Sequence, residues 1–462
     1  MAATASDEQN DQVSIKVLVD KEKSKVLFAE ATKDFIDVLF SFLTLPLGTI
    51  ARLVAAESNI EAVKFGSISS LYQSVANLDE QCLWNQTCKE MLLRPRNSMD
   101  CYCRKLKLNI DGTECLPFFF CKDRTCKVNN SCASIFRNQK CICGKLLNVF
   151  HPPNLTTEDG FVKETMTFIV SDDLFVMPNL LGTSINLLQK LGVNDINTFD
   201  KQTVIISKKE VTDLLKLSLI SKTPLSDFIF KKEQLVGNLD PRNVVEFWIG
   251  LGEVEEPCHE SNKMTVNVLR RKSNQQILFV EGQEDFADFL FSFLTFPLGG
   301  VLHMLVGFSS ISCIDNLYKS ITELSSDRCL RSQVVKDTVL TNPYISFQFE
   351  LRNKILPIPV HPVISRALKF VDPKSPISGG FTRGPTSFMV TDGFVVTPTS
   401  SISGLAYLEK TNVPLNDVEE RVISIGQKEG LNILKASLTS TSALTNGLGH
   451  SMIHQFLREN FP

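Results

Sequence analysis

Cysteines provide the main chemical signal of this chain, and they are concentrated in one stretch. Ten of the 13 cysteines fall between Cys82 and Cys143. Cys121 and Cys126 form one close pair, and Cys141 forms a second pair with Cys143 after fourteen intervening residues. Two close pairs joined by a short loop can place four thiolates tetrahedrally around one metal ion. The pattern therefore predicts a structural zinc site with the ligands Cys121, Cys126, Cys141 and Cys143.

The spacing leaves other uses of these thiols open, because neither pair has the common two-residue separation. Cys101, Cys103 and Cys115 could be alternative ligands or a second partial site, and all of the thiols could be free cysteines packed as small apolar side chains. A redox role is less favoured, since thioredoxin-like enzymes use a C-x-x-C pair. Residues 105–110 and 117–120 are predicted to be strands, so the zinc site would have the form of a ribbon.

The cysteine-rich stretch is also basic. Between Cys88 and Lys145, twelve Lys or Arg oppose five Asp or Glu, although the whole chain has a formal net charge of −3. This net charge predicts no general attraction to nucleic acid or anionic lipid. The basic stretch could still bind phosphate groups through residues 88–145, or it could dock on the acidic remainder of its own chain. Docking on its own chain is favoured. Any external partner is expected to be a protein, with nucleic acid as the alternative.

The search for a catalytic site yields no recognised constellation. The phosphate-binding loop, the dinucleotide fingerprint, H-E-x-x-H and G-x-S-x-G are all missing. His450 and His454 are four residues apart but have no third metal ligand nearby. Asp172 and Asp392 occupy equivalent positions of two repeats and could form an acid pair, but Asp is also typical of turns. We therefore expect a non-catalytic interaction or adaptor protein, with a nucleic-acid-binding protein or an enzyme with a dispersed site as alternatives.

An internal repeat organises the whole chain. Residues 35–48 read FIDVLFSFLTLPLG and residues 286–299 read FADFLFSFLTFPLG, which are identical at eleven of fourteen positions. Further matches follow in the same order: Leu71, Tyr72 and Ser74 recur as Leu317, Tyr318 and Ser320, and Lys209, Glu210 and Lys216 recur as Lys428, Glu429 and Lys435. Ordered matches along both halves imply a tandem duplication. The apolar motif is expected either to form the core of each unit, against that unit's own hairpin, or to form a pseudo-symmetric seam between the units, and core burial is favoured.

Each unit is predicted to be α+β. In the first unit, alternating apolar residues predict a hairpin over residues 15–29, and an apolar face at helical spacing predicts a helix from Phe35 to Phe42. Asp37 and its equivalent Asp288 lie near the starts of these helices and are expected to interact with the helix dipole. A second β element at residues 167–177 and a closing helix at 208–220 complete the unit, and all four segments recur in the second half. Hairpins mixed with helices, without regular βαβ alternation, are typical of α+β folds.

The predicted organisation is a disordered tail at 1–13, a first repeat at 14–230 with a cysteine-rich insert at about 82–150, a linker at 231–263, a second repeat at 264–448 and a C-terminal tail or helix at 449–462. The first residues show no secretory signal, so we expect a cytoplasmic or nuclear protein with reduced thiols. Residues 289–314 carry no charge and could span a bilayer by length. Pro297 and two glycines interrupt this run, so a buried helix–turn–helix is favoured over a membrane segment.

Several of these motifs together resemble a known family. They are the paired LFSFLT-x-PLG motifs, the cysteine pattern from Cys121 to Gly144, FMVTD at residues 388–392 and the run at residues 414–440. In these features the chain is similar to the plant family catalogued as domain of unknown function 674, over residues 14–448. The resemblance implies a plant source and a large paralogous group. It implies no activity, ligand or functional residue.

Overall fold

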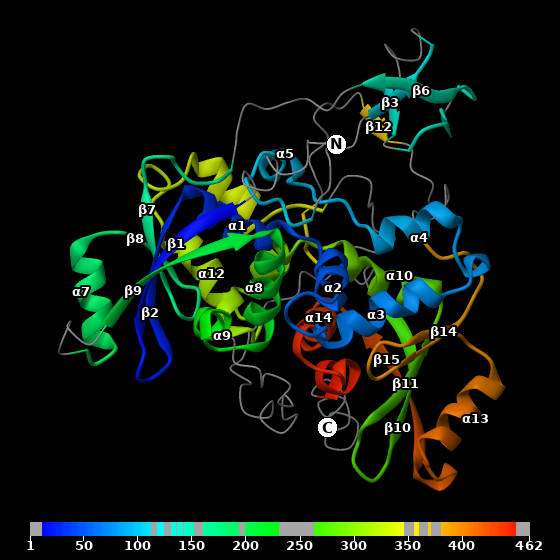
Figure 1. Ribbon diagram of the computed structural model, residues 1–462. Helices are drawn as coiled ribbons and strands as arrows, with labels where there is room; N and C mark the ends of the chain where they lie inside the picture. Colours follow the sequence, from blue (N-terminus) through cyan, green and yellow to red (C-terminus); the bar gives the residue numbers. More distant parts are fainter. Residues whose placement is uncertain are drawn as a thin grey trace, which may run out of the picture.

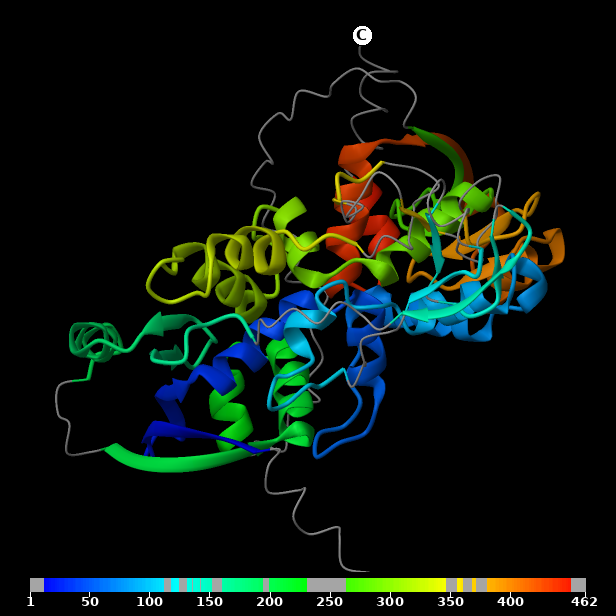
Figure 2. The same ribbon diagram turned by 90° about the horizontal axis from the view of Figure 1, so that it is seen from above.

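The computed structural model is a mixed α/β fold with three sheets (Figures 1 and 2). It describes residues 12–111, 118–123, 131–134, 136–141, 143–151, 160–193, 199–230, 263–345, 355–359, 368–370 and 380–449. Two sheets each belong to one half of the chain, and the third is small and lies over the cysteine-rich stretch.

The first sheet has the strand order β8-β7-β2-β1-β9, and all of its neighbours are antiparallel. Its strands are β1 (Gln12–Asp20), β2 (Lys25–Thr32), β7 (Thr167–Ser171), β8 (Val176–Pro178) and β9 (Phe199–Ser207). The predicted hairpin is confirmed, since Val17 pairs with Ala29. Alternate residues of β1 are buried, as its sequence pattern requires.

In the first half, α1 (Lys33–Ser41) and α8 (Lys208–Ile220) match the two predicted helices. The other helices were not predicted, and they include η1 (Phe42–Thr44), α2 (Leu47–Ala55), α3 (Gly66–Asn77), α7 (Leu181–Lys190) and α9 (Pro224–Phe230). Phe35, Leu39 and Phe42 are fully buried, and α1 contacts β1 and β2. Pro46 has extended backbone angles and forms the N-cap of α2, because proline fits the first turn of a helix but not its interior.

The second sheet repeats this arrangement with the order β14-β13-β11-β10-β15. Its strands are β10 (Met264–Arg271), β11 (Ile277–Gly282), β13 (Phe388–Thr391), β14 (Val396–Pro398) and β15 (Val418–Ile425). Its helices are α10 (Glu284–Ser292), η6 (Phe293–Thr295), α11 (Leu298–Met304), α12 (Ser312–Glu323), η7 (Val335–Thr341), α13 (Ser401–Lys410), η8 (Leu415–Asp417), α14 (Gln427–Thr439) and a final turn of helix at residues 443–449.

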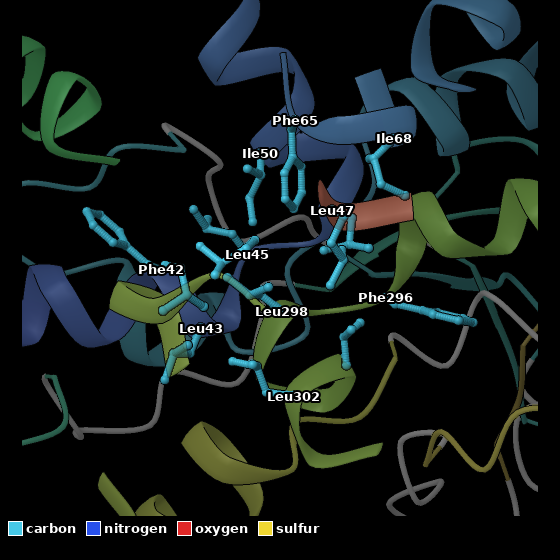
Figure 3. Packing of buried hydrophobic residues seen from close by; sticks show 14 of the residues in the cluster. Phe42, Leu43, Leu45, Leu47, Ile50, Phe65, Ile68, Phe296, Leu298 and Leu302 are labelled. Carbon is cyan, nitrogen blue, oxygen red and sulfur yellow. The ribbon is translucent and has the colours of Figure 1, made fainter. Parts of the chain in front are cut away.

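The two LFSFLT-x-PLG motifs meet within the buried hydrophobic core (Figure 3). Pro46 and Pro297 form an antiparallel bridge. The backbone N–H of Leu47 donates to the carbonyl oxygen of Phe296, and that of Leu298 donates to Leu45, both at 2.9 Å. Each motif therefore packs on its own hairpin, as expected, and also forms a seam with its counterpart. Buried residues of both halves join into one continuous core.

The second helix after each seam crosses to the other half. In Figure 1, α3 lies on the second sheet and α12 lies on the first. The contacts agree, since α3 packs against α14 and β14, and α12 packs against α8 and β8. Equivalent serines tie these helices down: Ser74 Oγ accepts from the N–H of Val396 at 3.1 Å, and Ser320 Oγ accepts from that of Val176 at 2.7 Å. The two halves are thus interlocked by a reciprocal exchange.

A second pair of crossings lies beyond these helices. Leu83 bridges to Thr382, and Leu330 bridges to Val162. Asp37 holds the first-half segment of one crossing, because its Oδ1 accepts from the N–H groups of Phe161 at 2.8 Å and Val162 at 3.0 Å. Asp288 makes the same two bonds with residues 381 and 382. The predicted interaction with the helix dipole therefore does not describe these residues fully, because both carboxylates also anchor the crossing segments.

The third sheet has the order β12-β4-β3-β6-β5. Its strands are β3 (Phe118–Cys121), β4 (Ser131–Ser134), β5 (Gln139–Lys140), β6 (Leu146–His151) and β12 (Leu368–Phe370). β12 comes from the second half and is parallel to β4, whereas the other pairs are antiparallel. Residues 105–110 are not a strand, which corrects the prediction. Their alternating apolar side chains (Leu106, Leu108 and Ile110) are buried in the main core without strand pairing.

Two shorter helices join α3 to this sheet, α4 (Gln86–Leu93) and α5 (Asp100–Cys103), after a 3-10 turn η2 (Glu80–Cys82). Leu83, Cys88 and Met99 from this segment are part of the main core, so the first half contributes only residues 118–151 to the small sheet, which β12 completes. Among the described residues, no helix combines the length and apolar character needed to span a membrane. The uncharged run at 289–314 is divided between α10, η6, α11 and the start of α12.

Candidate metal centre

Three cysteines of the small sheet come together at one end of it, and we refer to Cys121, Cys141 and Cys143 as the cysteine cluster. Their sulfur atoms lie within 4.8 Å of one another, and the Sγ atoms of Cys121 and Cys143 are 3.5 Å apart. Cys121 ends β3, Cys141 directly follows β5 and Cys143 lies in the turn before β6. Three of the four predicted ligands are therefore adjacent. The fourth, Cys126, lies outside the described residues.

The turn that carries Cys141 and Cys143 depends on glycine. Gly144 has φ = +81°, and no atom lies within 4 Å of the position that a Cβ would take there. Glycine is therefore required by the backbone angle and not by lack of space. The N–H of Gly144 donates to the carbonyl of Cys141, and the N–H of Cys141 donates to the carbonyl of Lys145, both at 2.8 Å. These bonds direct both thiols toward Cys121.

The surroundings of the cysteine cluster combine burial with nearby donors. Burial raises the pKa of the Cys121 thiol, and the backbone N–H of Asp123 opposes this shift by hydrogen bonding to the sulfur. Lys145 Nζ lies 2.7 Å from Asp123 Oδ2 and so links the two turns that carry the cysteines. A divalent metal would stabilise the thiolate forms much more strongly than these donors do.

The donor set fits a soft or borderline metal. Cys121 and Cys141 are buried and Cys143 is exposed, so a bound ion would be reached from one side. Three thiolates suit zinc, whereas magnesium and calcium prefer oxygen ligands. A tetrahedral zinc site held by the three described thiols has one position left for a fourth ligand.

Comparison with known families places the chain. It belongs to the family described as protein of unknown function (DUF674). The family model matches residues 9–428, which is nearly the full chain, and this confirms the resemblance seen in the motifs. No curated protein and no solved structure matches the chain. Membership of this family supplies no activity and no ligand.

Two of the alternative cysteine ligands lie elsewhere in this DUF674 chain. Cys103 is in the main core, where its sulfur is 3.5 Å from Thr44 Oγ1 and 3.9 Å from Asn97 Nδ2. Burial raises its pKa to about 12. Cys101 belongs to the same short helix and is not part of the cysteine cluster. Cys115 lies outside the described residues. Cys103 therefore acts as a packed core residue.

Asp172 and Asp392 do not form an acid pair, because each follows a strand of a different sheet. Asp172 accepts from Ser226 N at 2.8 Å and Ser226 Oγ at 2.7 Å. Asp392 accepts from Thr445 N and Oγ1, both at 2.8 Å. Each carboxylate thus fixes the last helix of its half to its sheet, and burial raises the pKa of both. His450 and His454 lie outside the described residues.

Lys216 is a buried charged residue that the sequence search did not single out as a candidate. Its amine donates to Ala56 O at 2.7 Å, Ser58 Oγ at 2.7 Å and Ile60 O at 2.9 Å. Burial lowers its pKa, a property that nucleophilic lysines share. All three protons are nevertheless used to hold the loop between α2 and α3. Its recurrence as Lys435 was the only sequence signal, and it indicates a structural role.

Proposed function

We propose that this protein is a non-catalytic interaction protein in which the cysteine cluster binds a structural zinc ion and makes the small sheet a zinc ribbon. The supporting observation is that three thiols from two separate turns lie within 4.8 Å of one another. Thiols at this distance repel as thiolates unless a cation neutralises them. A reducing compartment, cytoplasmic or nuclear, would keep such thiols available for the metal.

A non-catalytic role is supported by what the buried polar groups do. Asp37, Asp172, Asp392 and Lys216 each bond to backbone or hydroxyl groups that hold two segments together. A general acid or base must reach a proton of the substrate, whereas these four groups use their hydrogen bonds to hold segments of the fold.

We also infer that the chain is a tandem duplication with the ribbon inserted in the first copy. The two large sheets have the same strand order, and Ser74 and Ser320 make equivalent bonds across the halves. The repeat boundaries at 14–230 and 264–448, with a linker at 231–263, follow from the sequence matches. The exchanged helices mean that each packing unit contains elements from both copies.

Metal analysis of the purified full chain tests the zinc proposal. We expect about one zinc per chain, and we expect Cys141→Ser to lose it because one of the ligand thiolates is removed. Cys82→Ser is the matched control, since Cys82 is outside the cysteine cluster, and it should keep the metal. Wild-type protein that stays metal-free after purification with added zinc would refute the proposal. Equal zinc in both variants would refute the ligand assignment.

A further inference from the structure

The outer surface of the ribbon is basic. Within the described part of residues 118–151, the charged side chains other than histidine are Lys122, Arg137, Lys140, Lys145 and Asp123. All four basic side chains are exposed, and Asp123 is paired with Lys145. Lys122, Arg137 and Lys140 make no ion pair with a described residue. The positive charge is therefore available to a ligand, although the whole chain is slightly acidic.

An aromatic side chain lies on the same small sheet. Phe150 of β6 is 61% exposed and lies opposite Phe119 of β3, with ring centroids 6.4 Å apart in an edge-to-face contact. This contact holds the Phe150 ring from one side and leaves its other surfaces in solvent. Lys140 is paired with Leu146 at the other end of β6, four residues from Phe150. The position opposite Lys140 and the position of Phe150 are thus about 13 Å apart along β6.

From this arrangement we propose that the ribbon binds single-stranded nucleic acid, with phosphates at Lys122, Arg137 and Lys140 and a base stacked on Phe150. This inference rests on the proposed zinc ribbon and names its partner. A single strand offers free base faces for stacking, and stacking on one aromatic ring is independent of sequence. A duplex keeps its bases stacked within itself. An acidic peptide would need the cations but would gain little from Phe150.

The first experiment measures the charge contribution. Fluorescence anisotropy of a labelled fifteen-nucleotide oligothymidine is followed against full-length zinc-loaded protein at several salt concentrations. Each phosphate contact contributes about 0.7 to the slope of log affinity against log salt for single strands. The triple variant Lys122→Ala, Arg137→Ala, Lys140→Ala should therefore lower the slope by about 2. The charge-matched control replaces Lys201, Lys209 and Lys428, all exposed on the two large halves, and should bind like wild type.

The second experiment tests the ring. Phe150→Ala should weaken binding about 5- to 150-fold, as loss of one base stack predicts, and Phe150→Trp should retain it. Phe308→Ala is the control, since Phe308 is 68% exposed in the second half and should have no effect.

Zinc content, measured on every sample, separates this inference from the proposed function. Zinc-loaded wild type that does not bind the oligonucleotide at low salt overturns the partner and leaves the ribbon standing. Binding lost in the triple variant but unchanged in Phe150→Ala overturns the single-strand assignment in favour of a general acidic ligand. Binding by wild-type protein that stays metal-free despite added zinc keeps the partner and refutes the zinc ribbon instead.

Discussion

The two halves of the molecule share one scaffold and differ most in the segment between their crossing residues. In the first half, the cysteine-bearing strands β3 to β6 lie between the crossing residues Leu83 and Val162. In the second half, the residues between Leu330 and Thr382 contribute η7 and the short strand β12. The crossing bonds are nevertheless matched, since Trp84 N donates to Phe381 O at 2.9 Å and Arg331 N donates to Phe161 O at 3.0 Å. The scaffold therefore tolerates very different chains between two anchored points.

A smaller difference shows which contacts the scaffold needs. At the start of α3, Ser67 Oγ donates to Ser440 O at 2.6 Å, and at the start of α12, Cys313 Sγ donates to Ser221 O at 3.1 Å. The same crossing contact is thus made by a hydroxyl in one half and by a thiol in the other. The donor group differs between the two halves but the contact is kept. We therefore infer that these positions serve to hold the exchanged helices. Functional specialisation is then expected in the ribbon, which has no matching cysteines in the second half.

The strongest test of the shared scaffold is the central seam. Phe42→Ala and Phe293→Ala should each cost about 3–5 kcal/mol, because both rings are fully buried. One core runs through both halves, so either substitution should destabilise both halves together. Denaturant unfolding followed by circular dichroism should show a single shifted transition, and limited proteolysis should cut both halves. Phe308→Ala, at an exposed position, should leave the transition in place. Cleavage confined to the mutated half would mean that the halves fold independently.

The exchange of helices is tested at Gly66. A Cβ on this residue would lie 2.3 Å from the carbonyl oxygen of Ser437 in α14, and its φ is +46°. Gly66→Ala should therefore destabilise the protein by about 2–4 kcal/mol through left-handed strain and overpacking. Gly182→Ala in α7 is the control, because no atom lies within 4 Å of its Cβ position. That change should stabilise by up to about 1 kcal/mol. A neutral Gly66→Ala would show that α3 does not pack on α14.

Local patterns in the sequence were sufficient to predict elements whose partners are near in the chain. The hairpin β1–β2 and the helix α8 were predicted because apolar periodicity and turn residues determine them directly. β9 and β15 were missed, since both are edge strands in which an exposed apolar residue, Ile205 or Val422, interrupts the alternation of apolar and polar side chains. The strand predicted at 105–110 was wrong although its apolar residues do alternate. Its alternation reflects burial in the main core, and burial alone does not require a strand partner.

The exchange of α3 and α12 could not be predicted from periodicity. Each helix presents an apolar face that would suit either of two sheets built from matching sequences, so the pattern carries no information about which sheet is used. The clustering of the cysteines was easier to predict, because close cysteine pairs restrict where their thiols can lie. Three of the four predicted ligands are together. The main-core role of Cys103 depends on contacts with Thr44 and Asn97 that only the fold reveals.

A finer comparison concerns the two equivalent serines of the exchanged helices. Ser74→Ala and Ser320→Ala should each cost about 1–3 kcal/mol, because each leaves a buried backbone N–H of the opposite sheet without its acceptor. The two losses should be similar and should add in the double variant, since the sites lie on different sheets. Equilibrium unfolding of the three variants measures this. A cost at only one site would show that the two crossings differ in strength.

The smallest effect on overall stability is expected from removal of zinc. Cys121, Cys141 and Leu147 form a small cluster separate from the main core, so the ribbon can loosen while the scaffold stays folded. A chelator, or acid that protonates the thiolates, should release the metal and increase deuterium exchange within residues 118–151. Exchange in α1 and α10 should stay unchanged, and the main unfolding transition should keep its midpoint. If zinc removal also opened these two helices, the ribbon would be part of the scaffold, and the two halves would differ in how they fold as well as in what they bind.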